Sequence, residues 1–477
     1  MASTPSPAPR RSEDSIFQDT RFLNLLVQAA VVALVVTAIA FFARNVVTNL
    51  SDSNIPLGWN FLSQSAGFRI AEGPPFDPQE SYGRAFVIGI INTLRVVVAG
   101  IVLATLLGLV VGIARLSTNW LLRSLAGVYI NVIRNTPLLV QLFFWYTAVI
   151  LQLPDISAHM GLGDAVILSN RGMVMGWFYV SATGSALTWW LIGAAIAGYA
   201  GHKLRRRQLE QQGRFESGWL IGGLVFAAVF ALGYLITDRT ANLPANVTYE
   251  INRGDRGTLF VDANSDGNFD ANLGDLPLRY VPVTLFSADG VALGEELTEN
   301  DGGFRYYDLP TEGASLTWEN PAPLVYSAPE FQGFNVRGGR TFSPEFTALL
   351  LGLVLYTGAF IAEIVRAGIN AVPKGQWEAS KAVGLSSGDT LRLIVLPQAL
   401  RVIIPPLTSQ YLNLTKNSSL AIAIAYPDLF NVSLTIMNQS GATVQMFLLI
   451  MVTYLSFSLF TSLLMNLYNK RMALVER

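Results

Sequence analysis

The chain has 477 residues, of which 51% are hydrophobic and only 14% are charged, and its mean hydropathy is +0.41. Globular domains carry roughly 25% charged residues, so this composition predicts a polytopic membrane protein. The net charge of −1 identifies no charged partner, and we expect no nucleic acid to bind. The absence of cysteine excludes disulfides, thiolate metal sites and a cysteine nucleophile.

The N-terminal residues 1–21 are polar and rich in Ser and Pro, which predicts a disordered cytoplasmic tail. An apolar run of about 22 residues follows at 22–43, and a membrane-spanning helix needs roughly 20. A cleavable signal has an apolar region of about 7–15 residues. The run therefore predicts a first span that is retained in the protein.

Apolar runs long enough to cross a bilayer recur along the chain, and in lipid such runs must be helical to satisfy their own backbone. We expect eight spans in total, five of them within residues 22–237 and three within residues 346–477. The predicted spans are 22–43, 87–114, 126–150, 181–200, 217–237, 347–368, 399–425 and 444–467.

Basic residues cluster in the short connections, and such clusters face the cytoplasm. They lie before the first span, between the second and third, between the fourth and fifth, and after the last. The pattern predicts a multi-pass membrane protein with both termini in the cytoplasm. It also places the connection 371–398 inside and residues 238–345 outside.

Residues 238–345 lack lysine and contain short alternating segments such as Gly257–Val261 and Val281–Ser287. Turn signals such as Asp289-Gly290 flank these segments. About 100 residues of short strands indicate an inserted extracytoplasmic β-sandwich domain.

One loop of this insert places oxygen-bearing side chains at alternate positions around a glycine, as calcium sites do. The candidate ligands are Asp262, Asn264, Asp266, Asn268 and Asp270, with Asp275 further along. Leu273 stands where an EF-hand would have its bidentate Glu, so the loop is not an EF-hand. The segment from Arg256 to Leu309 is similar to the calcium-stabilised B-type repeat domains of bacterial surface proteins. The sequence is compatible both with a loop that binds a structural Ca²⁺ and with a solvated turn that binds no metal.

The connection before the seventh span carries the most specific pattern of the chain. It reads Glu378-Ala379-Ser380, three residues, Gly384, nine residues, Ile394, one residue, Leu396-Pro397. This pattern resembles the coupling loop of ABC importer permeases and departs from it only at Ser380, where the family has Ala. The resemblance implies that a separate ATPase grips this loop. Gly384 can adopt positive φ and end a short helix.

Four further segments resemble the polar and general L-amino-acid branch of this family: Asn92–Arg95, Arg134–Gln141, Tyr356–Gly368 and Asn413–Leu420. The resemblance implies a protein of the bacterial inner membrane with a five-helix ABC importer permease core at 87–150 and 347–467. It also implies a second permease subunit, forming a heterodimer, together with two ATPase subunits and an extracytoplasmic amino-acid-binding protein. The phosphate-binding loop motif is absent from the sequence, so ATP and Mg²⁺ must be bound by a partner subunit. We expect no catalytic residue and no cofactor for transport in this chain.

Polar residues within predicted spans are candidates for the substrate pathway, because they are costly in lipid. They are Thr93, Arg95, Asn413, Lys416, Asn417, Ser418 and Ser419. Arg95 could instead extend to the outer surface, and Lys416 could serve helix packing. Glu363 and Arg366 are three residues apart, which predicts an ion pair on one helix face. Pro137, Pro405 and Pro406 lie within predicted spans and predict interruptions of these helices.

Two other functions remain open at this point. An ion-coupled secondary amino-acid transporter often has inverted repeats, and no convincing internal repeat is found. A membrane-anchored structural or sensing protein would not need eight spans.

Overall fold

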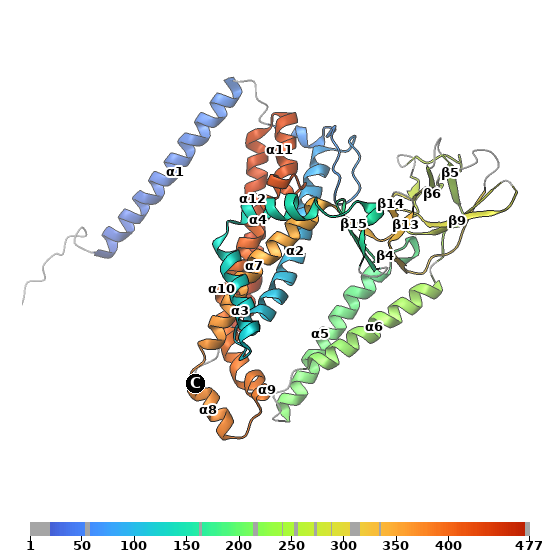
Figure 1. The fold of residues 1–477 in the computed structure, drawn as a ribbon. Helices are drawn as coiled ribbons and strands as arrows, with labels where there is room; N and C mark the ends of the chain where they lie inside the picture. The colour runs from blue at the N-terminus through green and yellow to red at the C-terminus, as the bar shows by residue number, and fades with distance from the viewer. Residues whose placement is uncertain are drawn as a thin grey trace, which may run out of the picture.

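The computed structural model is mainly helical, with a β-rich region beside one end of a helical bundle (Figure 1). It describes residues 20–52, 58–161, 165–212, 218–240, 242–251, 256–270, 274–287, 289–305, 315–332 and 335–472. The predicted tail 1–21 lies almost entirely outside the described residues.

The centre of the bundle is a close pair of helices, α2 (Tyr82–Arg115) and α7 (Pro344–Asn370). A Cβ at Gly112 would lie 2.8 Å from the Ala362 carbonyl oxygen and 2.9 Å from the Val365 Cβ, so this crossing requires glycine. Each helix begins at a serine cap: the Ser81 hydroxyl accepts from the Arg84 N–H, and Ser343 caps α7 in the same way.

The third span is interrupted at Pro137, as the sequence predicts. Helix α3 (Trp120–Asn135) ends before Pro137, and α4 (Leu138–Phe143) continues into a π-helical segment at Phe144–Ile150. Proline lacks an N–H and disfavours a helical residue before it. The side-chain amide of Gln141 donates to the carbonyls of Ile133 and Thr136, at 2.8 and 3.0 Å, and so satisfies the freed backbone.

The predicted interruption at Pro405 and Pro406 is wrong. Helix α10 (Leu396–Asn417) includes both prolines and then tightens into a 3₁₀ segment at Ser418–Ile424. It follows the short helices α8 (Lys374–Ala382) and α9 (Ser387–Asp389) and a π-helical turn at Thr390–Val395. The bundle is completed by α11 (Leu429–Ser440) and α12 (Thr443–Met472).

Two further helices, α5 (Leu187–Gln211) and α6 (Trp219–Thr240), form a hairpin beside this bundle. Helix α1 (Thr20–Asp52) stands apart from the bundle in Figure 1. Five stretches of the described residues are long and apolar enough to cross a membrane: α2, α6, α7, residues 387–424 and α12. The apolar parts Leu26–Phe42 and Leu138–Ile150 are shorter. The described structure therefore supports a multi-pass protein.

The β-rich region begins earlier in the chain than the predicted boundary at residue 238. Strands β1 (Met160–Gly161), β2 (Val166–Ser169), β3 (Gly172–Met175) and β15 (Arg340–Phe342) form one antiparallel sheet in this order. Strand β4 (Trp177–Val180) pairs with β12 (Leu324–Ser327). Strands that precede α5 are thus joined to strands that follow α6.

Most of the remaining strands form two small antiparallel sheets around a shared core. One contains β5 (Val247–Ile251), β6 (Arg256–Val261), β7 (Leu276–Pro277) and β10 (Gly303–Arg305), and the other β8 (Pro282–Phe286), β9 (Ala292–Leu297) and β11 (Ser315–Trp318). Leu259 and Phe304 from the first sheet are buried with Leu285 and Leu316 from the second. Strands β13 (Glu330–Gln332) and β14 (Asn335–Arg337) form a separate hairpin.

Candidate functional site

The predicted coupling pattern forms a compact helical projection at one end of the molecule. Helices α8 and α9 lie at this end, together with the C-terminal end of α5 and the N-terminal end of α6, whereas α11 and the β-rich region lie toward the other end (Figure 1). Glu378 and Ala379 of α8 are exposed. The pattern therefore presents a carboxylate beside a small side chain on the outer face of the projection.

The end of α8 follows the sequence prediction for Gly384. This residue has φ of 78°, and its N–H donates to the Lys381 carbonyl at 3.0 Å. The Leu385 N–H donates to the Ser380 carbonyl, also at 3.0 Å. These two bonds form a Schellman motif, in which a glycine in the left-handed region ends a helix. Val383, directly before the glycine, is 75% exposed at the tip of the projection.

Ser380, the one departure from the family pattern, is compatible with a buried position. Its side chain is buried, and its hydroxyl donates to the Trp377 carbonyl at 2.9 Å. A buried hydroxyl without such a partner would be costly. Serine can therefore occupy this position without leaving its hydroxyl unpaired.

The projection is joined firmly to the long helices on either side. Trp377 and Leu391 pack on a cluster that includes Val365 of α7 and Ala399 of α10. The Gln398 amide also donates to the Ile394 carbonyl at 3.0 Å. Leu396 and Pro397 form the first turn of α10, where the missing proline N–H would have no helical partner. A displacement of α8 would thus be carried to both α7 and α10.

The predicted ion pair of α7 is confirmed. Arg366 and Glu363 form a bidentate contact with distances of 2.6 and 3.0 Å. The pair satisfies both charges within one helix.

The candidate pathway residues of α10 divide between two faces. Asn413 and Lys416 are exposed, as are Val402 and Ser409 on the same face. Ser418 is buried, and its hydroxyl donates to the Thr415 carbonyl at 2.8 Å. Asn417 and Ser419 are partly buried, and the Ser419 hydroxyl donates to the Lys416 carbonyl. The exposed face therefore becomes polar toward the C-terminal end of the helix.

Thr93 and Arg95 are not on α10 but in the N-terminal half of α2. The Thr93 hydroxyl accepts from the Leu429 N–H at 2.9 Å and so holds the start of α11. Arg95 pairs with Glu72 at 2.9 Å and stacks over the Phe346 ring at 5.4 Å. Arg95 is therefore held by a carboxylate within the protein and does not simply extend to a surface.

Sequence reasoning missed Glu72, which lies in the irregular segment before α2. Its carboxylate also accepts from the Ser343 N–H at 3.1 Å, so it joins this segment to α2 and to the start of α7. The Gly-Pro sequence that follows Glu72 indicates only a loop. No local pattern could have connected it with residues 23 and 271 positions away.

The predicted calcium loop is held together by its own backbone. Asp262 accepts from the N–H groups of Ser265 and Gly267, at 2.6 and 2.9 Å. Asp275 accepts from those of Ala263 and Asp270, at 2.9 and 2.8 Å. Asp266 bonds to Asn264 and Asn268. Within the described residues no three acidic or histidine side chains converge as a metal-binding group. The calcium site stays a prediction.

Comparison with known proteins identifies the family of the chain. Residues 341–474 match the family model of the binding-protein-dependent transport system inner membrane component. This segment contains α7, the coupling pattern and the helices that follow it.

Three curated relatives match the chain over nearly its whole length. A putative amino-acid ABC transporter permease protein, YhdX of Escherichia coli, is 38% identical over 95% of this chain and 94% of the relative. The general L-amino acid transport system permease protein AapQ of Rhizobium johnstonii is 35% identical over 100% and 98%. The glutamate/glutamine/aspartate/asparagine transport system permease protein BztB of Rhodobacter capsulatus is 32% identical over 100% of both.

The extra helices and the β-rich region lie within these alignments, because the matches cover the chain from end to end. With five candidate spans among its described residues, the chain is a multi-pass protein of the inner membrane. It belongs to the family of amino-acid ABC transporter permeases.

Proposed function

We propose that this chain is one of two permease subunits that form the translocation path of an ATP-driven amino-acid importer. The observation that carries the proposal is the projection of α8, which exposes Glu378 and Val383 while Trp377 anchors it to the long helices. Two ATPase subunits would supply the work, and an external binding protein would deliver the amino acid. The chain itself is a transporter subunit and not an enzyme.

The orientation proposed from the basic residues agrees with the placement of the elements. Helix α8 and the basic C-terminal end of α5 lie at one end of the molecule (Figure 1). In the proposed orientation this end faces the cytoplasm, together with both termini. The β-rich region then faces outward as an extracytoplasmic β-sandwich, and α1, α5 and α6 complete eight spans.

We propose that the second permease covers the exposed face of α10. Asn413 and Lys416 lie on this face, and polar side chains are costly against lipid. A second subunit would enclose them in a water-filled path, where Lys416 could attract the carboxylate of an amino acid. Asn417, Ser418 and Ser419 would then line or support the path at the 3₁₀ segment.

The test is transport by the complete complex in proteoliposomes, with the ATPase, the second permease and the binding protein encoded in neighbouring reading frames. Binding protein loaded with amino acid should stimulate ATP hydrolysis, and Glu378→Arg should abolish this stimulation. Asp238→Arg reverses an exposed charge at the end of α6, outside the two sheets, and serves as the control. Uptake that persists without the ATPase and collapses with an ion gradient would instead show a secondary transporter.

We also propose that the two sheets of the β-rich region contact the binding protein or the partner permease. The ends of this part lie together: the Leu243 N–H donates to the Asn320 side chain at 3.0 Å, and Asn320 donates to Asn242 at 3.0 Å. A short linker can therefore replace residues 244–319 between these two adjacent ends. Unchanged affinity and rate in this variant would contradict the proposed contact.

A further inference from the structure

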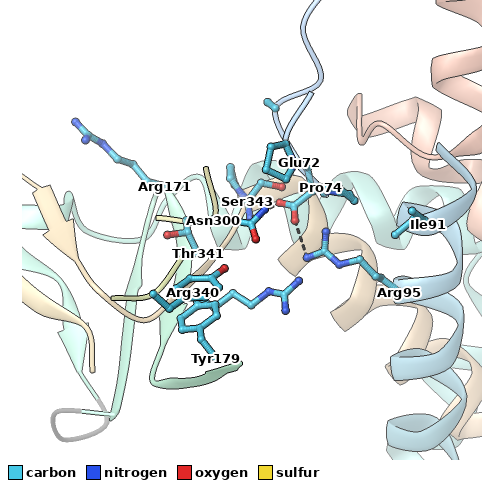
Figure 2. A pocket seen from close by; sticks show the side chains of 15 residues that line it. Glu72, Pro74, Ile91, Arg95, Arg171, Tyr179, Asn300, Arg340, Thr341 and Ser343 are labelled. Carbon is cyan, nitrogen blue, oxygen red and sulfur yellow. Dashed lines mark hydrogen bonds and ion pairs between the residues drawn. The ribbon is translucent and has the colours of Figure 1, made fainter. Parts of the chain in front are cut away.

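A pocket of about 590 Å³ lies between the helical core and the β-rich region. Its walls come from the segment before α2, from α2 itself, from β4 and β15, and from the start of α7 (Figure 2). Pockets that hold small molecules typically measure about 300–1,000 Å³. The volume is thus adequate for a molecule of amino-acid size.

Two guanidinium groups and one carboxylate define the charge of this pocket. Arg340 extends from β15 toward Arg95 of α2, and Glu72 lies beside Arg95 (Figure 2). The Glu72 carboxylate already pairs with Arg95 at 2.9 Å. Arg171 also lines the pocket, but its side chain is exposed and points away from the other two arginines. The inward-facing groups therefore leave one excess positive charge.

Arg340 is held in place by aromatic rings rather than by an acid. Its guanidinium lies 4.8 Å from the Trp177 ring centroid and 5.7 Å from that of Phe342. No carboxylate of the described residues forms a salt bridge with it. Burial, together with the charge of Arg95, lowers the pKa of Arg340 below its usual value. A bound anion would stabilise the charged guanidinium and so offset both the burial and the repulsion from Arg95.

The pocket wall opposite α2 contains a tyrosine with an unfavourable backbone conformation. Tyr280 has φ of 56°, in the left-handed region that few residues other than glycine adopt. Its ring stacks on Tyr179 with centroids 4.2 Å apart, and the Tyr179 hydroxyl donates to the Gly339 carbonyl at 2.7 Å. Backbone strain of this kind persists where the surroundings enforce it, often at ligand sites. The stack fixes a flat aromatic wall next to Arg340.

We infer that this pocket is an outer binding site for a small carboxylate, with Arg340 as its principal ligand. An arginine fork binds a carboxylate through two parallel hydrogen bonds. Arg95 faces the same space, while Glu72 offers a carboxylate for the ammonium group of an amino acid. That the ligand is a small anion rests on the charges of the pocket alone; that this anion is the carboxylate of an amino acid rests on the proposed function.

The test is equilibrium binding of radiolabelled L-glutamine and L-glutamate to the complete complex in nanodiscs, without the binding protein. Loss of one charge-assisted interaction costs about 1.5–3 kcal/mol, or roughly a tenfold to hundredfold weaker affinity. Arg340→Gln should therefore weaken binding at least about tenfold. Arg69→Gln removes an exposed arginine in the segment before α2 that does not line the pocket, and it should change binding less than about twofold. Equal binding by Arg340→Gln and the wild type would overturn the inference.

A second measurement does not depend on the folding of a variant. L-glutaminamide, which lacks the carboxylate, should compete with L-glutamine at least about tenfold more weakly in the wild-type complex. Equal competition would overturn the inference. Either overturning result could occur in a complex that still couples transport to ATP hydrolysis, so failure of the pocket is distinguishable from failure of the proposed function.

Discussion

The carboxylate of Glu72 and the guanidinium of Arg95 meet at 2.9 Å, with their side chains only 6% and 19% exposed. The pair connects the segment before α2 to α2, and the bond from the Ser343 N–H to Glu72 adds the start of α7. Asn92 strengthens the same junction, because its amide donates to the carbonyls of Glu72 and Pro427, each at 2.9 Å. The side chain and the backbone of Glu72 thus join its own segment to α2 and to the start of α7.

Removing the charge of Glu72 should therefore destabilise the protein. Breaking a buried pair leaves an uncompensated charge and typically costs about 3–5 kcal/mol, so we expect about 3 kcal/mol for Glu72→Gln at this partly exposed site. The matched control is Glu80→Gln, which breaks the Glu80–Arg84 pair, whose side chains are 41% and 46% exposed. Such surface pairs contribute about 0–1 kcal/mol. Thermal unfolding of both variants in detergent checks the difference, and equal midpoints would contradict it.

The turn at Gly384 should tolerate no side chain without a cost. Its φ of 78° is unfavourable for other residues by about 1–2 kcal/mol, so Gly384→Val should loosen the end of α8. We expect ATP hydrolysis stimulated by the binding protein to fall several-fold while basal hydrolysis by the ATPase persists. Gly375→Ala, in the first turn of the same helix with nothing near its Cβ position, should retain stimulation. Equal coupling in the two variants would refute this role of the turn.

The contact of α2 with α7 at Gly112 should be intolerant of bulk. Side chains forced into a packed interface cost about 1–3 kcal/mol or more, and any Cβ here meets the Ala362 carbonyl at 2.8 Å. Gly112→Leu should lower the yield of monodisperse protein and its unfolding midpoint. Gly193→Leu in α5, where nothing lies within 4 Å of the added Cβ, should change neither. Size-exclusion profiles that are normal for both variants would show that the crossing can open.

Calcium should slow amide hydrogen exchange in residues 262–275 if the loop binds the ion. Binding to the folded state alone stabilises it by about 2.7 kcal/mol at a hundred times the dissociation constant. The measurement compares the complete protein in calcium and in EGTA. Asp266→Ala should remove the difference, whereas Asp289→Ala, at an exposed turn outside the loop, should keep it. Identical exchange in both buffers would contradict calcium binding. The backbone N–H bonds to Asp262 and Asp275 would then be enough to hold the loop.

Local features of the fold could be predicted from the sequence. The end of α8 at Gly384 and the Glu363–Arg366 pair depend on residues within six positions of one another. Long apolar runs also predicted α2, α7 and α12, because a membrane helix satisfies its own backbone. The predicted interruption at Pro405 and Pro406 was wrong, because α10 remains helical there despite two missing N–H donors.

Long-range features could not be predicted in this way. Strand β3 pairs with β15, some 167 positions later at Val174 and Thr341, and the intervening α5 and α6 conceal this relationship. The pocket at Arg340 similarly combines β15 with α2 and with a loop that has no periodic pattern. These charged residues form one pocket only because the fold brings the three segments together.

The contact of α8 with an ATPase is the central claim, and site-specific crosslinking tests it most directly. The chain has no cysteine, so Val383→Cys introduces a single reactive thiol at the tip of the projection. A photoactivated crosslinker on this thiol should capture the ATPase subunit in the assembled complex. Val291→Cys, which is 61% exposed in the β-rich region, provides the control position. Capture of the ATPase from Val383→Cys alone is the predicted result, and its capture from Val291→Cys but not from Val383→Cys would contradict the account.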